Sequence, residues 1–144
     1  MVVVDTGPVV SAMNRGEGRR HAFAAQLLAS LGRRVVVPVP VLVEVDLLLR
    51  ARGHVRAATV FARACVDGVH QLTDLTEEDL RWAIGLGERY HDSGIDLPDL
   101  AVMALARRHR AQVLTWDFRH FRAVTPARGQ PWDLLVAEHE LPPP

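Results

Sequence analysis

Four carboxylates of this chain lie where an acidic side chain is unexpected. The chemistry-bearing positions are Asp5 after the run MVVV, Glu44 inside PVLVEVDLLL, Asp99 just before LAVMALA, and Asp117 at the end of QVLTW. A charge among apolar residues is costly to bury unless it is neutralised, paired or bound to a metal. The repeated placement therefore points to one shared role for the four acids.

The ligand types indicate which metal such a group of acids would hold. Carboxylates gathered in one site repel one another and raise each other's pKa, and a divalent cation removes that repulsion. Hard oxygen ligands without cysteine or a histidine pair favour Mg²⁺ or Mn²⁺ over zinc. The four acids therefore predict a Mg²⁺ (or Mn²⁺) site.

Taken alone, each acid also has a structural explanation. Asp99 suits the positive end of a helix dipole, Asp117 suits a turn after a strand, and Glu44 suits an exposed helix face. Asp46 competes with Glu44, but it lies two positions further along the same helix and points to another face, so only one of the pair reaches a site. The position of Asp5 is hardest to explain structurally, and the joint pattern is more specific than any single acid.

The seven histidines and the single cysteine do not form a zinc motif. No two histidines have ligand spacing within one helix, so packing or solvent-facing roles are favoured, with His21 and His120 as candidates for substrate contact. Cys65 lies in FARACV, where apolar residues recur at helical spacing, and is predicted to be a buried structural thiol. Without a disulfide framework, a visible export signal or a membrane-spanning apolar run, the chain is predicted to be cytoplasmic, with no membrane partner.

The basic residues narrow the classes of chemistry that this chain can perform. All 17 are arginine, and they balance 17 acids. The lack of lysine excludes P-loop, Schiff-base and kinase chemistry. The arginines occur in clusters, including Arg19 with Arg20 and Arg50 with Arg52. Zero net charge disfavours strong nonspecific nucleic-acid binding, whereas a local basic rim suited to phosphate stays open.

The elements that must position these side chains alternate between strand and helix. Apolar strands are predicted at 2–5, 35–38 and 111–117, with further short strands at 69–75 and 132–135. Helices are predicted at 8–14, 19–31, 40–52, 54–67, 77–90 and 96–109, the fifth opened by the capping box TEED. This alternation predicts a single-domain, three-layer α/β fold with a short parallel sheet flanked by helices. Sites in such folds form beyond the carboxyl ends of strands, where Asp5 and Asp117 lie.

Four stretches of the chain, in their order and spacing, resemble the PIN domain family and in particular VapC-type toxin ribonucleases. They are VVVDTGPVVSAMNRGEGRRH, PVPVLVEVDLLL, DLPDLAVMALARRH and VLTWDFRHFRAV, and the first and last are the most specific. The resemblance covers nearly the whole chain and implies a PIN domain over residues 1–139. The segment 140–144 is predicted to be a disordered, proline-rich tail.

The family's functional positions map onto this sequence residue by residue. The resemblance implies catalytic and metal-binding roles for four acids, with the first and third as the main ligands: Asp5, Glu44, Asp99 and Asp117. It also implies substrate contact through two hydroxyls, Thr6 and Thr115.

Three features of the sequence bear on this mapping. Leu100 follows the third acid, where the family commonly has alanine. Asn14 stands where relatives often have an acid. Asp96, three residues before Asp99, is a candidate to assist or replace it.

The resemblance implies a metal-dependent endoribonuclease that is the toxin of a type II toxin–antitoxin system, homodimeric and paired with a small VapB-type antitoxin. Two alternatives stay open: a PIN-fold RNA-processing nuclease outside such systems, and a non-catalytic PIN interaction module. Asp5-Thr6-Gly7 also resembles an aspartic-protease half-site, but that fold is all-β and would leave three acids unexplained. A receiver-like phosphoacceptor domain needs a lysine, which the chain lacks.

Overall fold

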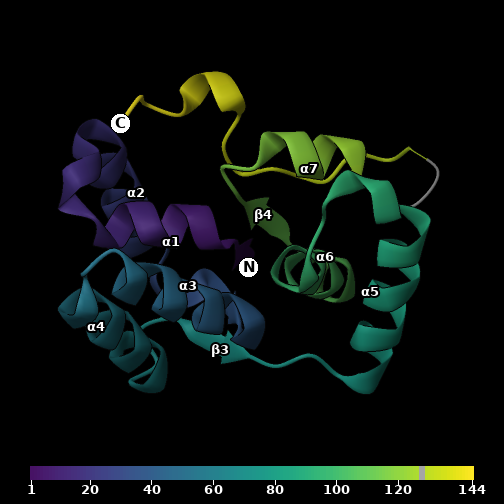
Figure 1. Cartoon of the computed structure of the whole chain (residues 1–144), viewed down its shortest axis with the longest axis horizontal. Helices are drawn as coiled ribbons and strands as arrows, with labels where there is room; N and C mark the ends of the chain where they lie inside the picture. The colour runs from purple at the N-terminus through teal and green to yellow at the C-terminus, as the bar shows by residue number, and fades with distance from the viewer. Residues whose placement is uncertain (127–128) are drawn as a thin grey trace.

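A four-stranded parallel sheet lies at the centre of the chain, in the strand order β3-β2-β1-β4. The structure is a computed structural model that describes residues 1–126 and 129–144. Figure 1 shows helices arranged around this sheet. The strands are β1 (Val2–Val4), β2 (Val35–Pro38), β3 (Gln71–Thr73) and β4 (Gln112–Leu114). The predicted three-layer α/β fold is confirmed.

The two inner strands explain why the sheet is parallel and covered by helices. Every residue of β1 and β2 is buried, and all but Pro38 are valine. β-branched residues favour strands, and a strand that is apolar throughout must be covered on both faces. Val3 pairs with Val36 on one side and with Val113 on the other. All four strands therefore end at one edge of the sheet.

The helices follow the predicted order closely. The six predicted helices form within two residues of their expected starts, and a seventh, α7, is new: α1 (Thr6–Met13), α2 (Gly18–Leu31), α3 (Val39–Ala51), α4 (Val55–Val66), α5 (Glu77–Arg89), α6 (Leu97–His109) and α7 (Phe118–Ala123). Short 3-10 turns lie at Arg15–Glu17, Gly32–Arg34, His91–Ser93 and Glu138–Glu140. The middle of α6 is buried because this helix contacts β1, β2, β4, α3 and α5.

The predicted capping box at the start of α5 is confirmed. The Thr76 hydroxyl accepts from the Asp79 backbone N–H at 3.1 Å, and the Asp79 carboxylate accepts from the Thr76 N–H at 2.9 Å. Asp79 is only 3% exposed, and its carboxylate also pairs with Arg108 of α6 at 2.7 Å. The cap therefore ties α5 to α6.

The C-terminal part differs from the sequence prediction. The third buried strand covers residues 112–114 rather than 111–117, because the chain turns away at Thr115. Residues 132–135 do not form a strand and make a single parallel bridge, Leu134 to Val113. Trp132 anchors this segment by packing edge-on against Phe121 and donating to the Val124 carbonyl at 2.7 Å.

The predicted tail, residues 140–144, lies beside α2, where Figure 1 places the C-terminus. The Pro142 carbonyl accepts a hydrogen bond from Arg20 Nε at 3.0 Å. The disorder expected for this segment stays a prediction.

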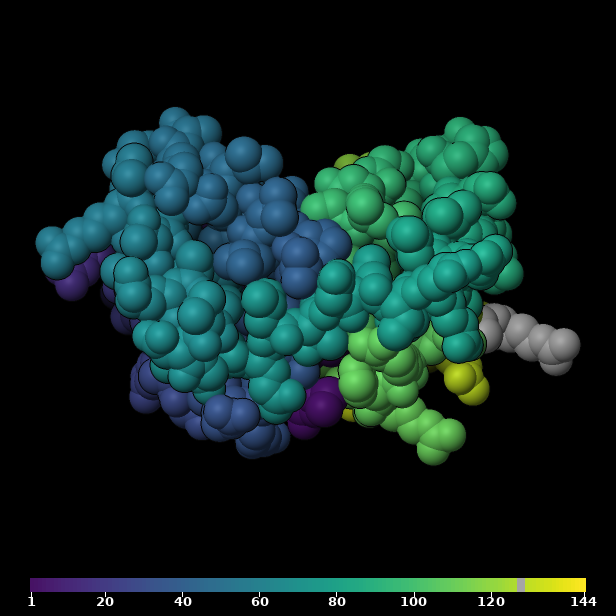
Figure 2. Space-filling model, turned by 90° about the horizontal axis from the view of Figure 1, so that it is seen from below, coloured from purple at the N-terminus to yellow at the C-terminus, as the bar shows by residue number. Residues whose placement is uncertain are grey.

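Seen from below, the molecule is hollowed between α3 and α4 on one side and α5 and α6 on the other (Figure 2).

Cys65 is 5% exposed within α4, and burial raises the pKa of its thiol to about 11, in agreement with a structural role. Over residues 1–126 and 129–144, none of the helices combines the length and apolar character needed to cross a membrane.

Candidate active site

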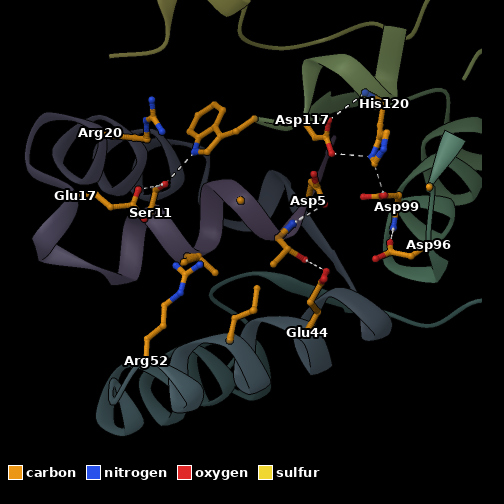
Figure 3. Close-up of a pocket in the computed structure, with 16 residues that line it drawn as sticks. Asp5, Ser11, Glu17, Arg20, Glu44, Arg52, Asp96, Asp99, Asp117 and His120 are labelled. Atoms are coloured by element: carbon orange, nitrogen blue, oxygen red, sulfur yellow. Dashed lines mark hydrogen bonds and ion pairs between the residues drawn. The ribbon is translucent and has the colours of Figure 1, made fainter. Parts of the chain in front are cut away.

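A cavity of about 520 Å³ lies at the carboxyl edge of the sheet and brings the four predicted acids together. Figure 3 shows the four predicted acids gathered on one side of the cavity, with Arg20, Arg52 and Glu17 on the other. The acidic residues that line it are Asp5, Glu17, Glu44, Asp96, Asp99 and Asp117. Because these acids come from different elements, tertiary folding alone assembles the site.

Asp5 is the most enclosed of the four predicted acids in the cavity, with 4% of its surface exposed. It ends β1 and caps α1, since one carboxylate oxygen accepts from the Thr6 N–H at 2.7 Å. The other oxygen accepts from the Thr115 hydroxyl at 2.7 Å. Burial raises the pKa of Asp5 to about 6; the charges of Glu44 and Asp117 add to the rise, and the two hydrogen bonds oppose it. This carboxyl group therefore titrates close to neutral pH.

Glu44 reaches the cavity from α3 and contacts the start of α1. Its Oε2 accepts from the Thr6 hydroxyl at 2.6 Å. Asp46, the competing acid of the sequence, instead pairs with Arg50 one turn further along the helix at 2.9 Å. Glu44 lines the cavity and Asp46 is not among its lining residues.

Asp99 enters the cavity from the first turn of α6. Asp96 caps this helix by accepting from the Asp99 N–H at 3.3 Å, so the two carboxylates lie close together. Burial raises the pKa of Asp99 to about 8, helped by the nearby charges of Asp5, Asp96 and Asp117. Without a cation, Asp99 therefore holds a proton at neutral pH.

Asp117 enters from the loop between β4 and α7 and caps α7. Its Oδ1 accepts from the His120 N–H at 3.0 Å, and its own N–H donates to the Thr115 hydroxyl at 2.9 Å. His120 Nδ1 lies 2.8 Å from Asp117 Oδ2 and 3.4 Å from Asp99 Oδ2. The cap therefore directs the imidazole into the acidic side of the cavity (Figure 3).

The residues on this side suit a divalent cation. Asp99, Asp117 and His120 offer ligand atoms that all lie within 4.8 Å of one another. Within the part of the chain that the structure describes, His120 Nδ1 is buried without a hydrogen-bond partner, since its short contacts to the carboxylates lack hydrogen-bond direction. A cation among these atoms would stabilise the charged form of Asp99, which burial and the neighbouring charges disfavour. Asp5 and Glu44, also predicted as ligands, line the same cavity but lie outside this compact group.

Both hydroxyls that the sequence predicted to contact substrate donate hydrogen bonds to carboxylates. Thr6 lines the cavity and donates to Glu44. Thr115 is only 1% exposed, and its hydroxyl lies between the Asp5 carboxylate and the Asp117 N–H. Its placement favours the positioning of acids over the predicted contact with substrate.

Several lining residues were not assigned to the site from sequence. Arg20 and Arg52 were recognised only as members of arginine clusters, although both reach the cavity. Trp116 also lines it and donates from Nε1 to the Ser11 hydroxyl at 3.1 Å. Its position just before the fourth acid was the only signal for it in the sequence.

The chain belongs to the PIN domain family, whose family model matches residues 2–125. It is 29% identical over 129 residues to ribonuclease VapC26 of Mycobacterium tuberculosis, covering 89% of this chain and 95% of the relative. The crystal structure of Mycobacterium tuberculosis VapC20, described as a sarcin-ricin loop cleaving toxin, superposes with a TM-score of 0.72 and 25% identity, over 83% of this chain and 91% of that one.

A toxin–antitoxin complex from Klebsiella pneumoniae shares the fold, with a TM-score of 0.61 and 19% identity over 88% of this chain and 98% of that one. The family membership expected from the four sequence stretches is thereby confirmed.

Proposed function

We propose that this protein is a metal-dependent endoribonuclease and the toxin of a type II toxin–antitoxin pair. The observation that carries the proposal is the convergence of the four acids from four parts of the chain on one cavity. Support comes from the similarity, along nearly the full length of both chains, to a protein curated as a ribonuclease.

The four acids take different roles according to their positions in the cavity. Asp99 and Asp117 offer oxygens for Mg²⁺ or Mn²⁺ that lie within 4.8 Å of each other. Asp5, whose oxygens are oriented by Thr6 and Thr115, and Glu44 complete the acidic side. A divalent cation held there supplies Lewis acidity, which makes water nucleophilic near neutral pH and neutralises charge on the scissile phosphate.

The opposite side of the cavity suits the rest of the RNA. Arg20 and Arg52 lie across from the acids and present guanidinium groups, which bind phosphate with two parallel donors. Arg20 is oriented by its bond to the Pro142 carbonyl. A phosphodiester can thus lie with its scissile group at the acids and a flanking phosphate at the arginines.

Metal removal tests the chemistry. Cleavage of RNA should stop in EDTA and return with Mg²⁺ or Mn²⁺, whereas Ca²⁺ should support little turnover because its bonds are longer and its geometry looser. The assay is gel analysis of a labelled RNA at pH 8. Full activity in EDTA would rule out the proposed mechanism.

Sequencing of RNA 5′ ends after induction tests the activity in cells. The wild type should create new ends that an Asp5→Asn variant does not, because Asp5 belongs to the acidic site. New ends common to both forms would contradict the assigned site. No new ends from the wild type would favour the non-catalytic interaction module.

The proposed partners are tested by co-expression and mass. A small VapB-type antitoxin encoded by a neighbouring reading frame should copurify with this chain and suppress cleavage. Light scattering of the chain alone should give the mass of a homodimer. Cleavage without any such neighbouring gene would favour an RNA-processing nuclease outside toxin–antitoxin systems.

A further inference from the structure

His120 combines three features that the four-acid site does not explain. Its Nδ1 is buried and has no hydrogen-bond partner among residues 1–126 and 129–144. This nitrogen nevertheless lies 2.8 Å from Asp117 Oδ2 and 3.4 Å from Asp99 Oδ2. The other ring nitrogen, Nε2, lies 3.1 Å from the Ser93 carbonyl oxygen.

The contact with Ser93 determines the tautomer. A carbonyl oxygen only accepts, so Nε2 must carry a proton and donate it to Ser93. Nδ1 of the neutral ring is then a lone pair that faces two carboxylate oxygens. When both carboxylates are ionised, such an arrangement repels unless a cation lies among the three atoms. Histidines that bind metals commonly donate their second N–H to a backbone carbonyl in this way.

The spacing of the three atoms suits a shared cation. Neighbouring ligands of an octahedral ion with bonds of about 2.1 Å lie about 3 Å apart. The two distances from His120 Nδ1, 2.8 and 3.4 Å, bracket this value. The rival arrangement is an imidazolium paired with both acids, but the contacts lack the direction that an N–H donor requires.

We propose that His120 Nδ1 is a direct ligand of the divalent cation held by Asp99 and Asp117. This inference rests on the proposed metal-dependent function and adds a nitrogen to a site otherwise made of oxygens. Imidazole is a softer ligand than carboxylate, so the site should prefer Mn²⁺ to Mg²⁺. The Ser93 carbonyl, at the end of the turn that precedes α6, is the contact that orients the ring.

Two substitutions test the roles of the two ring nitrogens of His120 separately. In His120→Gln, the side-chain amide reaches the position of Nε2 and keeps the bond to Ser93, but no ligand replaces Nδ1. In His120→Asn, an oxygen takes the position of Nδ1, so metal binding is retained without nitrogen coordination. His21→Gln is the matched control, because His21 bonds to the Ser11 carbonyl and is not among the residues that line the cavity.

The experiment measures Mn²⁺ bound to the full chain at pH 8 by pulsed electron paramagnetic resonance, with Mn²⁺ and Mg²⁺ affinities from calorimetry. The wild type and His21→Gln should show ¹⁴N coupling to Mn²⁺. His120→Gln should lose the coupling and bind Mn²⁺ about 10-fold or more weakly, with a smaller loss for Mg²⁺. His120→Asn should lose the coupling but bind Mg²⁺ nearly as well as the wild type, and circular dichroism should show that both variants are folded.

The outcomes separate this inference from the proposed function. Mn²⁺ binding without ¹⁴N coupling in the wild type, or coupling that persists in His120→Gln, would overturn the role of His120 and leave the acidic site intact. Failure of the wild type to bind Mn²⁺ at all would overturn both.

Discussion

At the scale of the residue, Asp5 shows how one side chain ends a strand, caps a helix and faces the acidic cavity. Its two oxygens accept from Thr6 and Thr115, so its orientation is set before any ligand arrives. Preorganised carboxylates avoid the cost of ordering at the moment of binding. Burial with a pKa of about 6 also means that the charged form needed to bind metal is present only above mildly acidic pH.

Removal of the Thr115 hydroxyl should shift the pH dependence of activity. The hydrogen bond from Thr115 stabilises charged Asp5 and lowers its pKa, so Thr115→Val should raise that pKa further. The acidic limb of the pH–rate profile should move up by about one pH unit, since a hydrogen bond to a charged group contributes about 1.5 kcal/mol or more. Thr115→Ser should restore the wild-type profile. An unshifted profile in Thr115→Val would contradict the positioning role.

Arg52 should act on substrate binding rather than on the chemical step. It lines the cavity opposite the acids, so Arg52→Gln should raise the KM for RNA about 10-fold while kcat changes little. The matched control is Arg50→Gln, because Arg50 pairs with Asp46 and is not a lining residue. Steady-state cleavage of a short fluorogenic RNA measures both constants. Equal effects of the two substitutions would show that only general charge matters.

At the scale of the element, three helix starts point their caps into the same cavity. Asp5 caps α1, Asp96 caps α6, and Asp117 caps α7. Backbone N–H groups at a helix start favour negative charge, so each helix partly stabilises the carboxylate that it presents. Parallel strands that end at one edge bring the starts of α1 and α7 side by side. Three acids of the cavity are therefore placed by where helices begin, whereas Glu44 reaches it from within α3.

The ion pair between Asp79 of α5 and Arg108 of α6 should be among the polar contacts that contribute most to stability. Asp79 is 3% exposed, completes the cap of α5 and pairs with Arg108. Asp79→Ala should lower the free energy of unfolding by about 2 kcal/mol, because it removes the buried carboxylate that caps α5 and pairs with Arg108. Asp46→Ala, which breaks an exposed pair with Arg50, should cost about 0.5 kcal/mol or less. Urea unfolding measures both, and equal losses would contradict this ranking.

At the scale of the whole molecule, the acidic cavity links stability to pH and to metal. The pKa values of Asp5 and Asp99 rise on folding from 3.8 to about 6 and about 8. Between the unfolded pKa of 3.8 and these raised values, the folded chain holds more protons than the unfolded chain, so the free energy of unfolding falls as pH rises. The empty acidic site therefore destabilises this fold at neutral pH, and a bound cation relieves that cost.

Thermal melting from pH 4 to 8 tests this linkage. In EDTA, the contribution of the two acids should lower Tm as pH rises, and Mg²⁺ should restore Tm at pH 8. Asp99→Asn should weaken the pH dependence and melt several degrees above the wild type at pH 8 in EDTA, yet lose cleavage. Asp46→Asn should keep both cleavage and the wild-type pH dependence. Unfolding of Asp99→Asn would identify Asp99 as a structural cap instead.

Much of this architecture was predictable from sequence because its causes are local. The valine runs of β1 and β2 predict buried strands, and the capping box at Thr76 predicts the start of α5. α7 was missed, although Asp117 stands three residues before His120, the spacing of a side-chain cap. Its six residues, FRHFRA, are too few for a helical period to be recognised.

The sequence by itself determined which acids are anomalous and that they belong beyond the ends of strands. Only the tertiary structure decided which atoms face one another: Thr115 with Asp5, 110 positions apart, and His120 with the Ser93 carbonyl, 27 positions apart. Residue type and period specify the face on which a side chain lies. Hydrogen-bond partners between distant segments depend on the register and packing of the whole sheet, which no local pattern contains.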